Sequence, residues 1–178
     1  MPPEPSDDAE LIARARAGST DALGALYARY AEPVMALAYR LLGSVADAED
    51  VLHDVFLGLP EALRRYDERG SFPSWLKRIA ARAALTRARS EGRRREVPLD
   101  AELHHAGSAE ADAFAARSAV ERALAGLPVT LRAVVVLKEL EGYSHAEIGA
   151  LLGISNAASE VRLCRALRLL RRAMEGSR

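Results

Sequence analysis

Apolar residues recur at helical spacing along most of the chain, and glycines mark where several of these runs end. The first run predicts a helix that begins at Ser6 or Asp7 and stops near Gly18. A second helix is expected over 21–42, ended by Gly43, because glycine readily adopts the left-handed conformation that closes many helices. No alternation of apolar and polar residues persists with the period of a strand, so the pattern predicts an all-α fold.

A third helix is expected after Ser44, because Ser44 and Asp47 have the spacing of a capping box. Gly58 and Pro60 interrupt its pattern and predict a kink or a restart, with Pro60 in the first turn of a short continuation. The helix is amphipathic, with one apolar face and one acidic face. The apolar face comprises Val45, Ala48, Leu52, Val55, Phe56, Leu59 and Leu63, and the acidic face comprises Asp47, Asp50, Asp54 and Glu61.

The stretch 66–74 has the glycine, proline and serines of a loop, and Pro73 suits the first turn of a helix. A long basic helix is expected over about 74–91, which completes a first domain over 7–91. The side chains expected to point inward from this helix are Trp75, Leu76, Ile79, Ala83 and Thr86.

Residues 92–116 turn from basic to acidic, contain Pro98 and Gly107, and lack sustained periodicity at first, which predicts a linker. A second domain is expected over 117–175. Its helices are predicted near 110–125, 129–141, 145–152 and 156–174. The 178 residues are therefore expected to form two small helical domains joined by a linker.

The formal net charge is zero, but the charged residues are segregated along the chain. Those in 47–61 are acidic, whereas 77–95 and 162–178 are rich in arginine. Two basic patches and one acidic patch suit a protein that holds a polyanion and docks on a basic protein surface. Solvated helix faces explain any one patch equally well.

The single cysteine, Cys164, excludes a disulfide framework and a clustered-cysteine zinc site, which suits a reducing cytoplasm. Residues 1–10 do not resemble a signal peptide, and no apolar run approaches the ~20 residues that span a bilayer. A soluble cytoplasmic protein without a membrane partner is expected. We expect Cys164 to be a buried or half-buried small side chain, and His104 and His105 to be solvated rather than metal ligands.

The sharpest local signal is a helix-turn-helix pattern over 144–155. Ser144 and Glu147 have capping-box spacing, Gly149 offers a small residue where two helices cross closely, and Gly153 suits a left-handed turn. Ile148, Leu152 and Ile154 supply a small core. An ordinary helical hairpin with a solvated basic face is the alternative.

The helix after Gly153 is the candidate recognition helix, whose first turns would enter the major groove. Its exposed residues there are expected to be Ser155, Asn156, Ala157, Glu160 and Val161. Further along, the expected apolar stripe is Leu163, Leu167, Leu170 and Met174, and the expected basic side is Arg162, Arg165, Arg168 and Arg172. Such arginines suit phosphates better than bases.

Motifs in both domains follow the order found in one protein family. In the first domain they are 17–18, 22–23, 26–30, 48–51, 54–56 and the run SFPSWLKRIA at 71–80. In the second they are LAGLP at 124–128, then 134–144, 147–149, 152–155 and 162–166. With these segments the chain resembles the extracytoplasmic-function (ECF) group of bacterial RNA polymerase sigma factors over nearly its whole length.

The resemblance implies a protein without catalysis or cofactor of its own that gives core RNA polymerase its promoter choice. In this family the first domain, region 2, binds the largest polymerase subunit and opens the −10 element of promoter DNA. The second domain, region 4, reads the −35 element. Many relatives are held inactive by an anti-sigma factor, so such a partner stays open here.

The resemblance, with the charge pattern and the helix-turn-helix, assigns site residues of which none is catalytic or metal-binding. For core-polymerase docking they are Asp47, Glu49, Asp50, His53, Asp54 and Phe56. For −10 DNA they are Tyr66, Asp67, Ser71, Lys77, Arg78, Arg82, Thr86 and Arg89, of which Tyr66, Asp67 and Ser71 belong to the segment that holds a flipped base. For −35 DNA they are Ser155, Asn156, Ala157, Glu160, Val161, Arg162, Arg165 and Arg168.

Departures from the family pattern concern the DNA-binding positions most. Arg82 and Thr86 stand where the family usually has asparagine and aspartate, and Ser159 and Glu160 replace an apolar and a basic residue. Ser159 is expected to weaken the small core. Glu160 repels phosphate but can accept a hydrogen bond from cytosine N4, so we expect an unusual promoter sequence or weak binding without polymerase.

Two other functions stay open. One is a protein-interaction factor derived from the same family, which binds polymerase or an anti-sigma factor without reading DNA. The other is a stand-alone helix-turn-helix regulator that binds operators as a dimer. No nucleophile, base and acid set and no phosphate-binding glycine loop stands out, so an enzyme is not expected.

Overall fold

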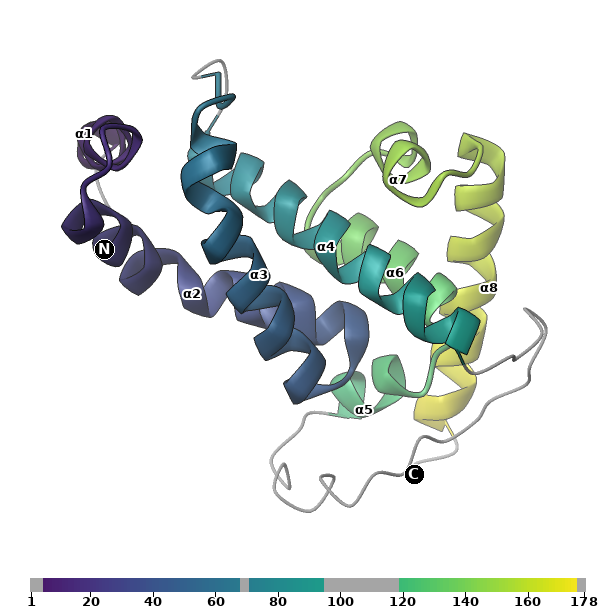
Figure 1. The fold of residues 1–178 in the computed structure, drawn as a ribbon. Helices are drawn as coiled ribbons and strands as arrows, with labels where there is room; N and C mark the ends of the chain where they lie inside the picture. The colour runs from purple at the N-terminus through teal and green to yellow at the C-terminus, as the bar shows by residue number, and fades with distance from the viewer. Residues whose placement is uncertain (1–4, 68–70, 95–118, 176–178) are drawn as a thin grey trace. The chain divides into compact units, whose positions relative to one another are not determined.

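The computed structural model describes residues 5–67, 71–94 and 119–175, and every regular element within these ranges is a helix (Figure 1). The chain divides into two compact units, 1–87 and 88–178. The predicted all-α fold with two helical domains is therefore confirmed. Of the predicted linker, residues 92–94 continue a helix and the rest lies outside the described ranges.

Four helices belong largely to the first unit: α1 (Pro5–Arg16), α2 (Thr20–Leu42), α3 (Val45–Leu63) and α4 (Phe72–Arg94), the last of which continues past residue 87. Their ends follow the signals in the sequence. Gly43 ends α2 with φ +74°, and the Ser44 hydroxyl accepts a hydrogen bond from the Asp47 N–H at 3.3 Å to begin α3. Local residues thus decide where these helices start and stop.

Packing in the first unit rests on leucines from α2 and α3 and on both alanines and larger side chains from α4. Leu26, Leu37, Leu59 and Leu63 are each less than 2% exposed. The buried alanines of α4 are Ala80, Ala81 and Ala84. Phe72, Leu76 and Leu85 of α4 are buried as well, so this helix contributes both small and large side chains to the core.

α3 continues through Gly58 and Pro60 without interruption, so the predicted restart is wrong. A proline in a helix interior costs ~3 kcal/mol, because it removes one backbone hydrogen bond and crowds the preceding turn. Burial of Val55, Leu59 and Leu63 stabilises the same stretch by roughly 1.5–3 kcal/mol for each side chain. The gain from packing exceeds the local cost, and the helix persists to Leu63.

α1 packs on α2 through Ile12 and Ala15, which are both 2% exposed. Near its start, Asp8 accepts a hydrogen bond from Arg29 at 2.5 Å and a second from the Tyr30 hydroxyl. Burial raises the pKa of Tyr30 well above its ordinary value, and the hydrogen bond to Asp8 raises this pKa further. The Tyr30 phenol therefore stays protonated and ties α1 to α2.

The second unit contains α5 (Ala119–Ala125), α6 (Val129–Val135), η2 (Val136–Leu140), α7 (His145–Leu152) and α8 (Asn156–Glu175). The helix predicted over 129–141 is present as α6 continued by the π-helical turn η2, where the Glu141 N–H donates to the Val136 carbonyl at 3.0 Å. The predicted helix near 110–125 is described only from Ala119 onward, as α5.

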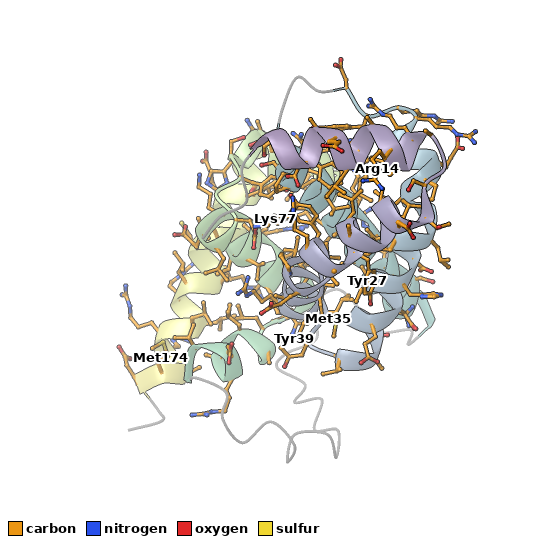
Figure 2. The ribbon with its side chains drawn as sticks, turned by 90° about the vertical axis from the view of Figure 1, so that its left-hand side faces the viewer. Arg14, Tyr27, Met35, Tyr39, Lys77 and Met174 are labelled. Carbon is orange, nitrogen blue, oxygen red and sulfur yellow. The ribbon has the colours of Figure 1, made fainter. Side chains whose placement is uncertain are left out.

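The small core of the second unit lies between α5, α6 and α8. Its members are Leu124, Leu127, Leu131, Val135 and Ala166, with Leu163, Leu169 and Leu170 packed against them. The apolar stripe predicted for α8 is thus partly wrong, since Leu167 and Met174 are 43% and 45% exposed. Figure 2 shows Met174 near the C-terminal end of α8. Leu167 follows the buried Ala166 directly, which turns its side chain about 100° away from the core. Cys164 is exposed and not buried as predicted.

Candidate functional site

Residues close together in sequence fix the start of α7 and the turn between α7 and α8. The Ser144 hydroxyl accepts from the Glu147 N–H at 3.2 Å, and the Glu147 carboxylate accepts from the Ser144 N–H at 2.9 Å, which completes a capping box. Gly153 ends α7 with φ +70°, a conformation that favours glycine. A Cβ on Gly149 would lie 2.7 Å from the Ile154 carbonyl oxygen, so this close crossing requires glycine. The predicted helix-turn-helix is confirmed.

A buried polar pair fixes α7 against α8. Ser159 is 0% exposed, and its hydroxyl lies 2.9 Å from Nδ1 of His145, which is half-buried at the start of α7. The hydroxyl of Ser159 has a hydrogen-bond partner despite its burial, and the expectation that this serine weakens the core stays a prediction. Sequence reasoning missed His145, since only the folded helix-turn-helix brings residues 145 and 159 together.

The first two turns of α8 present a surface free of core residues except Ser159 and the half-buried Ala158. The predicted −35 residues there are all exposed: Ser155, Asn156, Ala157, Glu160 and Val161. Val161 is 65% exposed, so its side chain is available for contact with a partner. The Ser155 hydroxyl also accepts from the Ala158 N–H at 3.1 Å, so it caps the helix.

Arginines continue this surface along α8. Arg165 and Arg168 are exposed, Arg162 is half-buried, and Arg172 is exposed in the last turn. The Nε of Arg168 donates a hydrogen bond to the Cys164 carbonyl oxygen at 3.4 Å. These guanidinium groups can bind phosphate oxygens beside the groove that the first turns of α8 would enter.

A second exposed basic face lies on α4. Its residues follow one another at three- and four-residue steps, which places them on one side of the helix. They are Arg78, Arg82, Thr86 and Arg89, all exposed, with Lys77 half-buried beside them. Thr86 was predicted to point inward and does not, because the neighbouring Leu85, 3% exposed, takes the inward position.

At the start of α4 the predicted loop residues lie in different environments. Tyr66 is only 7% exposed, and its ring centroid lies 4.7 Å from that of Trp75 and 5.6 Å from that of Phe72. Asp67 and Ser71 are exposed, and the Ser71 hydroxyl accepts from the Ser74 N–H at 3.3 Å. Residues 68–70 lie outside the described ranges. A role for these side chains with a flipped base stays a prediction.

The acidic side of α3 is partly engaged by α4. Arg87 donates from Nε to Asp47 at 2.8 Å, and its Nη2 lies 2.7 Å from Asp47 and 2.6 Å from Asp50. The sequence offered no sign of this pairing, because α3 and α4 are separate in sequence and Arg87 belonged to a patch of one charge sign. The remaining predicted docking residues comprise exposed Glu49, His53 and Asp54 and half-buried Phe56.

Phe56, which belongs to the predicted docking residues of α3, makes an apolar contact. Its ring lies 4.8 Å from the ring of Tyr27 on α2, edge to face, and Tyr27 is 47% exposed. Leu57 beside it is 67% exposed. An acidic rim around exposed apolar and aromatic side chains is a typical composition for a protein-binding surface.

Within the ranges that the structure covers, no three histidine, cysteine or acidic residues are placed to hold a metal ion. His104 and His105 lie outside those ranges. None of the described helices is long and apolar enough to cross a bilayer.

Known proteins match both units. The protein family described as Sigma-70 region 2 matches residues 26–94, and the family described as Sigma-70, region 4 matches residues 117–170. The ECF RNA polymerase sigma factor SigM of Mycobacterium tuberculosis is 32% identical, over 94% of this chain and 84% of the relative.

Two solved structures share the fold. CnrH, solved in complex with the cytosolic domain of CnrY, is 29% identical with a TM-score of 0.57, over 96% of this chain and 99% of CnrH. The sigma factor RpoE of Bartonella quintana, solved with the anti-sigma factor NepR, is 18% identical with a TM-score of 0.61, over 87% of this chain and 98% of RpoE.

Proposed function

Since the chain belongs to the ECF group of RNA polymerase sigma factors, we propose that α8 reads the −35 element while the first unit docks on polymerase and opens the −10 element. A sigma factor of this group binds core RNA polymerase and directs promoter recognition, and it is not an enzyme. The match to region 2 over 26–94 argues against a stand-alone helix-turn-helix regulator.

The observation that carries the proposal is the exposed start of α8. Gly153 and the His145–Ser159 pair hold α8 at a fixed angle to α7, and most side chains beyond the turn, Ser159 excepted, are exposed or half-buried. Asn156 and Glu160 are four residues apart and exposed on that surface. Asparagine pairs with adenine and glutamate accepts from cytosine N4, so α8 has the groups for direct base reading. Arg165 and Arg168 would fix its register on phosphates.

In the first unit, the exposed face of α4 supplies the positive charge for the −10 region. Arg78 and Arg82, with Arg89 farther along α4 beyond the first unit, would follow backbone phosphates, and Asp67 and Ser71 lie before the start of α4, where an opened strand would enter. The acidic residues of α3, with Phe56, would dock on polymerase. Because Arg87 holds Asp47 and Asp50, docking there must include Arg87 or displace it.

We also propose an anti-sigma factor as a regulatory partner and a cytoplasmic location. CnrH was solved with the cytosolic domain of another protein, and RpoE of similar fold with an anti-sigma factor. The cytoplasmic location follows from the two main partners, since polymerase and promoter DNA meet there in bacteria.

The test combines the purified chain with core RNA polymerase and a library of genomic fragments from its own organism, with transcripts sequenced. The wild type is expected to select one promoter class with −35 and −10 elements. Glu160→Ala is expected to relax the base preference at one −35 position, at a cost of roughly 1–3 kcal/mol in discrimination. Arg165→Ala should weaken binding to all sequences alike.

Arg171→Ala is the matched control, because Arg171 is exposed on the same helix but is not among the residues proposed to bind DNA. Unchanged promoter selection in both Glu160→Ala and Asn156→Ala would contradict −35 reading by α8. Polymerase binding without any promoter-specific transcript would instead favour the protein-interaction factor.

A further inference from the structure

Arg16, in the last turn of α1, contacts the end of α3 and the residues after it. Its Nε donates to the Leu63 carbonyl at 2.9 Å, and its Nη2 donates to the Tyr66 carbonyl. The guanidinium carbon lies 5.6 Å from the centre of the Tyr66 ring. One side chain therefore binds two backbone carbonyls and one ring, nearly 50 residues away in sequence.

The end of α3 has no left-handed glycine and closes with a tightened last turn, in which the N–H groups of Arg64, Arg65 and Tyr66 donate to the carbonyls of Glu61, Ala62 and Leu63 at 3.1–3.2 Å. Its last turn has no basic residue, and the residue that follows it, Arg64, is right-handed rather than a left-handed glycine. Arg16 adds a second partner to the Leu63 carbonyl, which also accepts from the Tyr66 N–H at 3.2 Å, and it binds the Tyr66 carbonyl as well. One side chain from α1 therefore ties this tightened turn to the chain that leaves it.

α1 holds the aromatic cluster from both of its ends. The cluster consists of Tyr30, Tyr66, Phe72 and Trp75, with ring centroids 4.7–5.6 Å apart in the contacting pairs. Asp8 accepts from the Tyr30 hydroxyl, and Arg16 lies over Tyr66. Tyr66 precedes Asp67, and Phe72 follows Ser71, so this cluster sets the positions of both exposed residues proposed to bind −10 DNA.

We propose that Arg16 is a positioning residue for promoter opening. It acts through the Leu63 and Tyr66 carbonyls and the Tyr66 ring, and it holds Asp67 in place without contacting DNA itself. The inference rests on the proposed function of the first unit. It also gives a function to α1, which lies outside the 26–94 match to region 2.

The experiment uses holoenzyme assembled from core polymerase and the full chain, on the strongest promoter from the library above, with 2-aminopurine in the −10 non-template strand. Arg16→Ala is expected to slow opening about ten-fold, equivalent to a loss of roughly 1.4 kcal/mol of transition-state stabilisation. Its affinity for core polymerase should change less than about two-fold. Arg16→Lys should give an intermediate rate, because lysine keeps the charge but lacks the fork that serves two carbonyls.

Arg14→Ala is the matched control, since Arg14 is exposed in the same turn of α1 (Figure 2) and should open the promoter at the wild-type rate. Trp75 is the only tryptophan, so its emission reports the aromatic cluster directly and should shift in Arg16→Ala alone.

Opening at the wild-type rate in Arg16→Ala would overturn the inference. So would a parallel loss of polymerase affinity and thermal stability, which would make Arg16 a structural brace only. A wild-type holoenzyme that forms but opens no promoter would refute the proposed function of the first unit and the DNA role of Arg16 together. In that case the expected shift of Trp75 emission in Arg16→Ala would still show that Arg16 holds Tyr66.

Discussion

The two units reach fixed geometries by different means. The first uses long helices, with α2, α3 and α4 spanning 23, 19 and 23 residues, and fills the space between them with side chains. The second packs short helices, with α5, α6 and α7 spanning 7, 7 and 8 residues, against the one long helix α8 of 20 residues, and relies on a capping box, a left-handed glycine and one backbone crossing. Such short helices are marginal alone. The first unit is therefore expected to be sensitive to the size of buried side chains, and the second to backbone shape.

The largest expected effect is from Leu37→Ala in the first unit. Leu37 is 0% exposed, and removal of a buried leucine side chain lowers the free energy of unfolding by about 2–5 kcal/mol. Urea unfolding followed by Trp75 fluorescence measures it, because Trp75 belongs to the same unit. A loss below 1 kcal/mol would mean that packing does not dominate there.

Gly149→Ala tests the backbone crossing in the second unit. The added Cβ would approach the Ile154 carbonyl oxygen to 2.7 Å, so the turn must shift, and the free energy of unfolding should fall by about 1–3 kcal/mol. Loss of far-ultraviolet circular dichroism on heating measures it, and −35 binding should weaken with it. The control is Gly24→Ala on α2, where nothing lies within 4 Å and the same change should stabilise by about 0.5–1 kcal/mol. Equal effects at both glycines would remove the contrast between the units.

The His145–Ser159 pair is the side-chain contact between α7 and α8 on which the angle of the helix-turn-helix is expected to depend. A double-mutant cycle of His145→Ala and Ser159→Ala should give a coupling of about 0.5–1.5 kcal/mol in unfolding free energy. Additive effects of the two substitutions would show that the hydrogen bond contributes nothing and that the backbone alone holds α8.

The smallest expected effect is the pH dependence that Tyr30 gives the first unit. Because its pKa is raised in the folded state, the stabilisation is fully present below the ordinary tyrosine pKa of about 10 and is lost as pH rises above it. Tyr30→Phe should lower the unfolding free energy by about 1 kcal/mol near neutral pH, through loss of the hydrogen bond to Asp8, and should flatten the decline above pH ~10. Parallel curves for wild type and variant throughout the alkaline range would contradict a raised Tyr30 pKa.

Sequence signals predicted the features that neighbouring residues control. Gly43, Gly153, Ser44 and the Ser144–Glu147 box lie where their chemistry placed helix ends. Predictions of features that depend on packing were wrong where they rested on a local rule alone. Pro60 does not break α3, because burial of apolar side chains around it outweighs the missing hydrogen bond.

Contacts between distant residues could not be predicted from one sequence. Arg87 with Asp47 and His145 with Ser159 each join two helices, Arg16 with Tyr66 joins α1 to the segment after α3, and no spacing rule relates these positions. The exposure of the side chains at the start of α8 could be predicted because a helix-turn-helix fixes which face of its second helix is outward. The roles of these residues with DNA and polymerase remain predictions.

The crossing at Gly149 has a consequence for how promoter preference can change. The residues that fix the angle of α8 are buried or belong to the turn, while Asn156, Glu160 and Val161 are exposed and contribute nothing to the core. Substitutions at the exposed positions can therefore accumulate at little cost in folding. Such a scaffold favours divergence of duplicated copies toward separate sets of target genes, and it offers a starting point for orthogonal promoter and regulator pairs.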